Sequence, residues 1–240
     1  MGLINVNGFP IIRGSIRRPR IGVWNADLVV DCTSDISGAV TIATEDGAFS
    51  LAGVAYRMGV FQATLSMKVI GGTGRLSIPP GGIGTSISPK SYQGATARLV
   101  VNDILAACGE TLAATSDAAT LNTVLRRWVV TAGSGKDALA RLLEQFQDIS
   151  WRVLADGTVW IGSETWPSAP TTQFDILERH FGEGRILIGS QQPWLMPGTK
   201  ITISSSSTAG TQYVDYVVDD ISPEKIRSEV YFTRTHVGSA

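Results

Sequence analysis

The sequence predicts a mainly β protein of the α+β class, with two small antiparallel β-barrel, tube-like domains and a short helical insert between them. Apolar and β-branched runs, broken by turn signals about every 8–12 residues, dominate both ends of the chain. Apolar residues follow helical spacing in the middle. We therefore expect a first barrel with an N-terminal arm in residues 1–94, the insert in 95–148 and a second barrel in 149–240.

Strands are predicted in the first segment wherever apolar residues alternate with polar ones or form short runs. Gly47 supplies the turn between two of these runs, and a glycine-rich turn follows the last one at 71–74. The prolines and glycines at 79–84 predict a loop. The expected strands are residues 21–30, 40–43, 49–56 and 62–70.

Three short helices are predicted in the insert. Residues 97–108 have helical periodicity and precede Gly109, a residue type that favours the conformation just past a helix end. Ser134 begins the third helix as an N-cap, with Asp137 near the positive end of the helix dipole. The apolar stripe of this third helix is Ala138, Leu139, Leu142, Leu143 and Phe146. The second helix is predicted from the spacing of Leu121, Val124, Leu125 and Trp128.

The third segment begins with a tryptophan-rich hairpin at 151–162. Asp156 and Gly157 separate its two apolar runs, and this pair accepts the positive φ angles of a type I′ turn. The hairpin follows directly on the helical insert, so we expect it to lead the chain into the second barrel. Further strands are predicted at 185–188, 200–203, 213–218 and 229–233.

The composition bounds the function. A net charge of −1 gives no overall field that would recruit nucleic acid or an anionic membrane. Without a long apolar run or the apolar core of a signal peptide, we expect synthesis in the cytosol and no membrane anchor. Cys32 and Cys108 are expected to be reduced and buried. Because 17% of the residues are charged, we expect part of the surface to be covered in an assembly.

The glycine-rich segment Gly133-Ser134-Gly135-Lys136 is predicted to be a helix cap rather than a phosphate-binding loop. Such a loop requires glycine where this chain has Val130, and serine or threonine where it has Asp137. The two histidines, His180 and His236, have no accompanying metal-ligand spacing. We therefore predict no cofactor and no metal site.

No catalytic residue is predicted either, so the chain is not expected to be an enzyme. It has no Gly-x-Ser-x-Gly motif. Glycoside hydrolysis requires two facing carboxylates, and nothing in the spacing of Glu110, Glu164 and Glu178 singles out such a pair.

Two groups of residues are interface candidates. The arginines of the N-terminal arm alternate with isoleucines and are expected to contact acidic groups of a partner subunit; a nucleic acid in a channel and a solvated tail are the alternatives. A turn with apolar anchors is expected at a subunit or domain contact. The arginines are Arg13, Arg17, Arg18 and Arg20, and the turn residues are Trp194, Leu195 and Met196.

Several segments, taken in order, form the pattern on which a resemblance to a known family rests. They are the strand at 21–27, the glycine turn at 71–76, the helix at 96–108 with its Cys-Gly-Glu-Thr end, the Leu-Arg-Arg-Trp at 125–128, the helix at 135–146, the hairpin at 151–162, the Pro-Gly-Thr at 197–199 and residues 227–231. Over residues 20–235 the chain resembles the baseplate or tail hub proteins of tailed bacteriophages, which are similar in fold to the contractile-tail hub and to the base of type VI secretion spikes.

The resemblance implies a structural virion protein of the tail baseplate. Three copies would form a ring of six similar barrels that joins the sixfold tail tube to the threefold tail tip or spike. The implied partners are other copies of the chain, the tail tube protein, tail-tip or other baseplate proteins, the tape-measure protein in the lumen, and DNA in transit during genome ejection. The resemblance transfers no catalytic residue.

Two other functions stay open from the sequence. A carbohydrate- or receptor-binding β-module predicts coplanar aromatic side chains, with Trp160 and Trp166 facing solvent. A tail-tip peptidoglycan hydrolase predicts paired carboxylates or a zinc cluster converging in a cleft.

Overall fold

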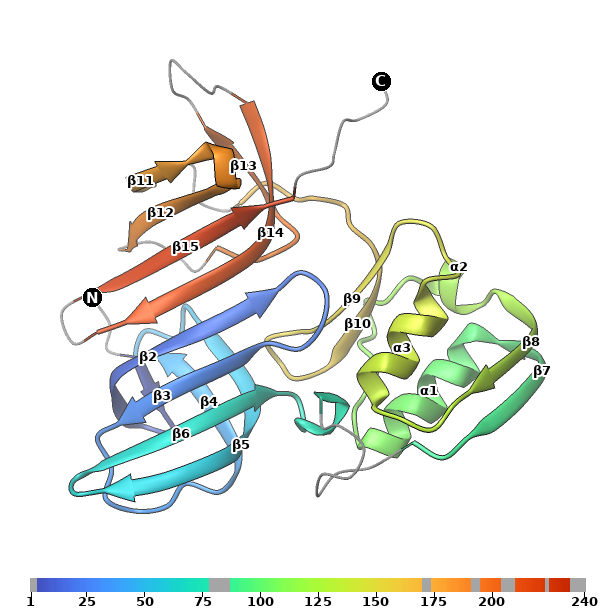
Figure 1. The fold of residues 1–240 in the computed structure, drawn as a ribbon, viewed down its shortest axis with the longest axis horizontal. Helices are drawn as coiled ribbons and strands as arrows, with labels where there is room; N and C mark the ends of the chain where they lie inside the picture. The colour runs from blue at the N-terminus through green and yellow to red at the C-terminus, as the bar shows by residue number, and fades with distance from the viewer. Residues whose placement is uncertain are drawn as a thin grey trace.

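The protein was analysed as a computed structural model, which describes residues 4–77, 87–169, 174–190, 195–203, 210–222 and 225–233. Strands dominate these residues, and the α-helices are confined to the middle of the chain (Figure 1). The predicted mainly β fold class is therefore confirmed. The predicted loop at 79–84 lies outside the described residues.

The N-terminal unit is a closed antiparallel barrel of six strands. Its strand order is β1-β4-β5-β6-β3-β2, and a pairing between β1 and β2 closes it. Gly47 adopts a φ of 70° in the predicted turn between β4 and β5, a conformation that glycine adopts without strain. The predicted N-terminal arm is itself a strand of this barrel. The strands are β1 (Ile4–Val6), β2 (Phe9–Pro19), β3 (Asn25–Val30), β4 (Gly38–Thr44), β5 (Ser50–Phe61) and β6 (Thr64–Gly71).

Two of the three helices predicted in the insert are present in the structure. The first, α1 (Ala97–Cys108), is capped by Gly109 at a φ of 70°. In α3 (Gly135–Leu143) the Ser134 hydroxyl accepts a hydrogen bond from the Asp137 N–H, as the capping pattern predicts. A 3-10 turn, η1 (Arg75–Ser77), connects β6 to this region and contacts both α1 and α3.

The predicted second helix is wrong over most of its length. Helix α2 (Ala118–Leu121) ends before Val124, and residues 124–130 form strand β8 (Val124–Val130), which pairs with β7 (Lys90–Thr96). Three of the seven β8 residues are valines, whose branched side chains favour extended backbone. Strand β7 lies about thirty residues earlier in sequence, so the local helical spacing did not indicate this partner.

The predicted hairpin is present as β9 (Ile149–Val153) and β10 (Val159–Ser163), but its turn is not type I′. Gly157 has a φ of 84°, whereas Asp156 is absent from the positive-φ residues. The Leu154 N–H donates to the Thr158 carbonyl, and the Asp156 carboxylate accepts from the Thr158 N–H. A longer loop therefore replaces the two-residue turn.

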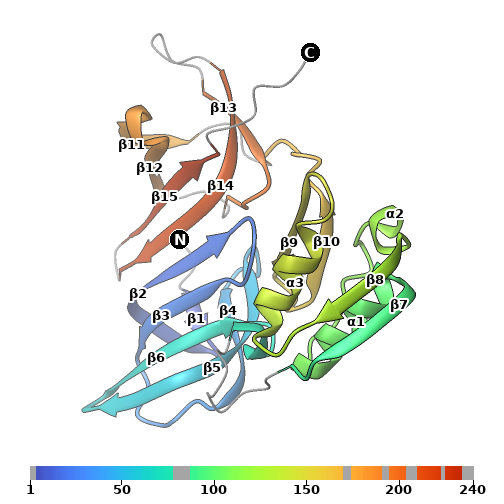
Figure 2. The same cartoon turned by 45° about the vertical axis from the view of Figure 1, so that its right-hand side comes forward.

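This hairpin lies between the barrel and the insert (Figures 1 and 2). The Gly22 N–H donates to the Trp151 carbonyl on the barrel side, and the Ala113 N–H donates to the Val159 carbonyl on the insert side. Its buried side chains share one continuous core with the barrel and the helices. The boundaries at 94/95 and 148/149 remain predictions.

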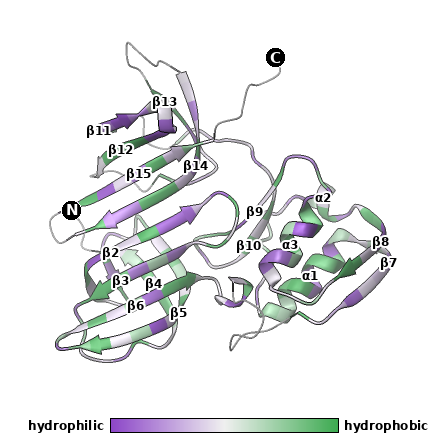
Figure 3. Ribbon diagram, viewed as in Figure 1, coloured by the Kyte–Doolittle hydropathy of each residue, from purple (hydrophilic) through white to green (hydrophobic). Residues whose placement is uncertain are grey.

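A second antiparallel sheet with its own core follows, in the order β11-β12-β15-β14-β13. Its strands carry both hydrophobic and hydrophilic residues, for example β14 and β15 (Figure 3), and buried positions recur along each of them. Strand β14 also pairs with β2, so the barrel and the second sheet are hydrogen-bonded to each other. The elements are β11 (Asp175–His180), η2 (Phe181–Glu183), β12 (Arg185–Ser190), β13 (Lys200–Ile203), β14 (Gly210–Ile221) and β15 (Ile226–Phe232).

Candidate interaction surface

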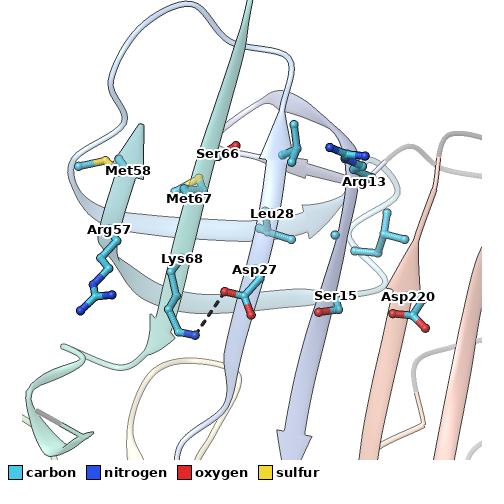
Figure 4. A pocket seen from close by; sticks show the side chains of 13 residues that line it. Arg13, Ser15, Asp27, Leu28, Arg57, Met58, Ser66, Met67, Lys68 and Asp220 are labelled. Atoms are coloured by element: carbon cyan, nitrogen blue, oxygen red, sulfur yellow. Dashed lines mark hydrogen bonds and ion pairs between the residues drawn. The ribbon is translucent and has the colours of Figure 1, made fainter. Parts of the chain in front are cut away.

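Eight strands form one continuous run, β5-β6-β3-β2-β14-β15-β12-β11, that spans both units. The register aligns one residue from each strand into a row across this run. In Figure 4 the first five members lie side by side along one face of the sheet. In strand order the row is Arg57, Lys68, Asp27, Ser15, Asp220, Arg227, Gly189 and Asp175. The run therefore presents a polar face, hereafter the row face.

An open groove of about 810 Å³ lies along the first five strands of the row face. Asp27 occupies its middle, and its two carboxylate oxygens bind Arg17 at 2.6 Å and Lys68 at 3.3 Å. Partial burial opposes ionisation of Asp27, but the hydrogen bonds from these two cations hold its pKa below the usual value. Asp27 therefore carries a charge at neutral pH and offsets part of the basic charge around it.

Asp220 has the opposite electrostatic environment. Burial and the neighbouring Glu229 carboxylate raise its pKa, while Arg17 partly opposes this shift. Charge is also distributed unevenly along the row: Arg57 and Lys68 stand at the barrel end, and Asp175 stands at the far end.

Both ends of the eight-strand run are open edges within the part of the chain that the structure describes. At one end, β11 pairs with β12 alone. At the other end, β5 pairs with β4 through residues 50–55, whereas residues 57–61 pair with β6 alone. An unpaired edge presents backbone N–H and C=O groups that can accept another strand.

The free half of β5 is also apolar. Met58, Val60 and Phe61 are 38%, 44% and 71% exposed, and Tyr56 beside them is 39% exposed. At the opposite edge Leu177 of β11 is 52% exposed. Apolar side chains that gather on an unpaired edge are typical of an interaction surface.

The four arginines predicted to contact a partner lie on or just after β2, and three of them bind acidic residues of this chain. Arg17 binds Asp27 on the row face. Arg18 is buried and binds Asp219 of β14 at 2.7 Å. Arg20 joins three parts of the fold: it follows β2 and donates to Asp215 of β14 and to Ser150 of β9.

Arg13 is exposed and lines the groove. It faces solvent, whereas Arg17 is partly exposed and Arg18 is buried. For Arg18 and Arg20, the acidic groups lie within the same chain. A contact of these arginines with another subunit remains a prediction.

The predicted apolar turn lies partly at the boundary between the barrel and the second sheet. Leu195 is 4% exposed and belongs to the core of the second sheet. Met196 is 38% exposed, and its sulfur accepts a hydrogen bond from the Arg18 Nη1 at 3.1 Å. Trp194 lies outside the described residues.

Glu110 is a buried carboxylate whose partners the sequence did not indicate. It follows α1, and its Oε1 accepts hydrogen bonds from the backbone N–H of Thr73 at 2.9 Å and from the Thr73 hydroxyl at 2.6 Å. Thr73 of the glycine turn at 71–74 therefore binds a carboxyl group of this chain. Burial raises the pKa of Glu110, although the bonds from Thr73 and the charge of Arg75 oppose the shift.

The two tryptophans that a sugar-binding surface would require are half-buried and already in contact. The Arg152 guanidinium carbon lies over the Trp160 ring, 4.3 Å from the ring centre. Trp166 packs edge-on against Tyr213. Both rings therefore pack against neighbouring side chains, and they do not form the pair of coplanar, solvent-facing aromatic surfaces that a sugar-binding site requires.

Among the described residues no group of three or more His, Cys, Asp or Glu side chains is arranged to hold a metal ion. Cys32 and Cys108 are buried, as predicted, and neither forms a disulfide. None of the helices that the structure describes is long and apolar enough to cross a membrane.

Comparison with known proteins gives likeness at the level of structure. No family model and no curated protein matches the sequence. The 43 kDa tail protein of prophage MuSo2 from Shewanella oneidensis superposes with a TM-score of 0.66 at 10% identity, over 97% of each chain. A tail protein from Neisseria meningitidis MC58 gives 0.66 at 13% identity, over 96% of this chain and 95% of that one.

A third solved structure connects the fold to secretion systems. The E. coli c3393 protein is described as a component of the type VI secretion system with structural similarity to the bacteriophage T4 tail proteins gp27 and gp5. It superposes with a TM-score of 0.67 at 12% identity, over 98% of this chain and 77% of that one. The chain therefore shares the fold of these tail proteins and of this secretion-system component. The likeness extends over the barrel, the insert and the second sheet.

Proposed function

We propose that the chain is a structural subunit of a phage-type tail baseplate, three copies of which form a hub around a channel. The main support is the eight-stranded run, which is continuous within one copy and, among the residues that the structure describes, has an open edge at each end. A sheet with two different open edges extends by adding another copy, and a closed ring satisfies both edges. The shared fold with prophage tail proteins supports this reading.

The row face is the surface that we assign to the channel. The residues in its row are polar, charged or glycine, while the buried side chains lie in the cores. Ion pairs such as those of Asp27 reduce the net charge of this face. A lining with both signs of charge lets DNA and the tape-measure protein pass without tight binding, because neither finds an extended surface of opposite charge.

The proposed partners follow from this position. Other copies of the chain complete the ring, the tail tube protein stacks on one side and tail-tip or spike proteins occupy the other. The protein then resides in the virion tail. No covalent bond is made or broken in this role, since the subunit joins the sixfold tail tube to the threefold tail tip or spike.

The two alternative functions have less support. A hydrolase requires two available carboxylates, and in the groove Asp27 has both oxygens bound to cations. A carbohydrate-binding module requires free aromatic faces, whereas Trp160 and Trp166 are in contact with neighbouring side chains.

Light scattering across a range of protein concentrations, with negative-stain images of the same sample, tests the proposal. We expect a particle of three times the 25.5 kDa chain mass that appears as a ring with a central hole. A compact monomer at every concentration would favour a binding module instead.

A further inference from the structure

The row face carries a second hollow, where the barrel meets the second sheet. Tyr216 precedes Asp220 by four positions on β14, and Tyr231 follows Arg227 by four positions on β15. Because side chains alternate along a strand, both tyrosines lie on the same side of the sheet as the row. A pocket of about 560 Å³ opens here, a volume within the range of ligand sites in proteins. Residues of both units line it, among them Pro19, Ile21, Glu183, Asp215, Tyr216 and Tyr231.

The two tyrosine rings form an angled pair. Their centres lie 5.7 Å apart, and their planes are inclined to each other at 51°. A nucleobase or a sugar ring is flat and stacks best on one plane or between two parallel planes, which this pair does not provide. A compact cation is attracted to the face of an aromatic ring and does not require two rings to be parallel. The ring geometry therefore favours a cation.

The charged groups of the lining also favour a cation. The side chains of Glu183 and Asp215 are 64% and 43% exposed, whereas the side chain of Arg20 is 19% exposed. The Arg20 guanidinium is already bound within the fold, since it donates to Asp215 and to Ser150, and its carbon lies 5.6 Å from the Trp166 ring centre. The pocket therefore presents two accessible carboxylates and one largely covered cation.

Glu183 carries its charge at neutral pH. The hydrogen bond from Arg185 holds the pKa of Glu183 below its usual value. The phosphates of a nucleic acid would be repelled by carboxylates at this place, so the charge of the lining disfavours DNA as the occupant.

An apolar surface lies beside the acidic groups. Ile21 is 47% exposed, and both Ile21 and Pro19 line the pocket. Lysine and arginine have a long apolar stem that covers such a surface while the charged head reaches polar groups. The pocket thus combines the three features that a basic side chain requires: apolar surface for its stem, aromatic rings and carboxylates for its charge.

We propose that this pocket, hereafter the tyrosine pocket, holds a lysine or arginine side chain from a basic segment of a protein that lies in the channel. The inference rests on the proposed function, which assigns the row face to the channel. The stem packs on Ile21, and the charged head lies between the rings of Tyr216 and Tyr231 and the carboxylates of Asp215 and Glu183. Each copy holds one side chain, so the contact is weak and the segment can leave the channel.

Binding of a short peptide tests the tyrosine pocket in the full-length chain. The probe is a glycine–serine peptide with one central arginine, and the control peptide carries citrulline, which has nearly the same shape without the charge. The chain has 5 tyrosines, so 3-fluorotyrosine labelling gives separate fluorine NMR signals, which Tyr216→Phe and Tyr231→Phe assign. We expect the arginine peptide to shift these two signals, and the citrulline peptide to bind at least about tenfold more weakly.

Two substitutions at position 216 test the contact with the ring. Tyr216→Phe keeps the ring and should bind the arginine peptide like the native chain. Tyr216→Leu removes the ring and should weaken binding about threefold or more, measured on the signal of Tyr231. Circular dichroism verifies that both variants fold. Equal affinities of the two variants would overturn the proposal, because the cation would then not contact the ring.

A charge substitution tests the acidic side of the pocket. Glu183→Gln should weaken binding of the arginine peptide about two- to fivefold, the range expected for an exposed ion pair. Glu144→Gln, at an exposed position just after α3, changes the net charge by the same amount and should leave the affinity unchanged. Equal weakening in both variants would show that net charge alone attracts the peptide, and would overturn the proposal.

The peptide experiment is independent of assembly, because the residues that line the pocket belong to one copy of the chain. A protein that forms the trimeric ring by light scattering but shows no shift at either tyrosine overturns the tyrosine pocket and leaves the hub proposal standing. Arginine-dependent shifts in a protein that stays monomeric support the pocket and contradict the hub. An oligothymidylate that shifts the two signals more strongly than the arginine peptide would assign the pocket to nucleic acid and overturn the inference.

Discussion

Arg18 of β2 and Asp219 of β14 form a buried ion pair at the joint between the barrel and the second sheet. The Asp219 Oδ2 accepts from Arg18 Nη2 at 2.7 Å and from Nε at 3.1 Å, and the side chains are 3% and 0% exposed. The other carboxylate oxygen of Asp219 accepts from the Ser228 hydroxyl at 2.6 Å. Since every strand contact between the units passes through β2 and β14 in the described residues, this pair holds the geometry of the whole run.

Removing one partner of this pair should be strongly destabilising. Arg18→Met leaves the Asp219 carboxylate buried without its cation, and such a loss costs about 3–5 kcal/mol of unfolding free energy. Urea unfolding followed by tryptophan fluorescence measures the change. The matched control is Arg17→Met, which breaks the partly exposed pair with Asp27 and should cost less than about 1 kcal/mol. Equal losses in the two variants would show that the buried pair has no special role.

Glu110 should make stability depend on pH in a defined direction. Burial raises its folded-state pKa above the unfolded value, so the native state binds the proton more tightly than the unfolded state does. Its contribution is therefore complete below the unfolded pKa and is lost as the pH rises through the folded pKa. We expect the unfolding free energy of the native chain, minus that of Glu110→Gln, to fall as the pH rises above the ordinary glutamic acid pKa of 4.5. A difference that rises or stays constant would contradict this assignment.

Gly135 should not tolerate a side chain, although alanine favours helices. A Cβ at this position would lie 2.5 Å from the Cys108 sulfur and 2.7 Å from Leu76 Cδ2, and both neighbours are fully buried. Gly135→Ala is expected to lower the unfolding free energy by about 1–3 kcal/mol through overpacking. The control is Gly210→Ala, where nothing lies within 4 Å of the added Cβ. The explanation fails if the two variants unfold at the same urea concentration.

Local features were predictable from the sequence because their causes are local. Gly47 and Gly109 adopt the positive φ angles that their turn and cap require. Ser134 caps its helix through a residue three positions later. Strand alternation gave the fold class, since one face of each strand must be buried.

The remaining features depend on residues that are distant in sequence. Arg18 and Asp219 are 201 positions apart, so nothing in the arginine-rich segment indicated an acidic partner in the same chain. Strand β8 forms because it pairs with β7, and the helical spacing around Val124 did not indicate this partner.

Asp27 should keep the row face from binding polyanions. Its carboxylate binds Arg17 and Lys68, and Asp27→Asn would remove the acidic partner of both cations. We expect this variant to elute from immobilised heparin at a higher salt concentration than the native chain, because binding to a polyanion increases with the number of available cations. Asp31→Asn, on an exposed position just after β3, changes the net charge by the same amount and is the matched control. If both variants elute together, net charge explains the effect; if Asp27→Asn alone is retained, the ion pairs of Asp27 set the charge of the surface that we assign to the channel.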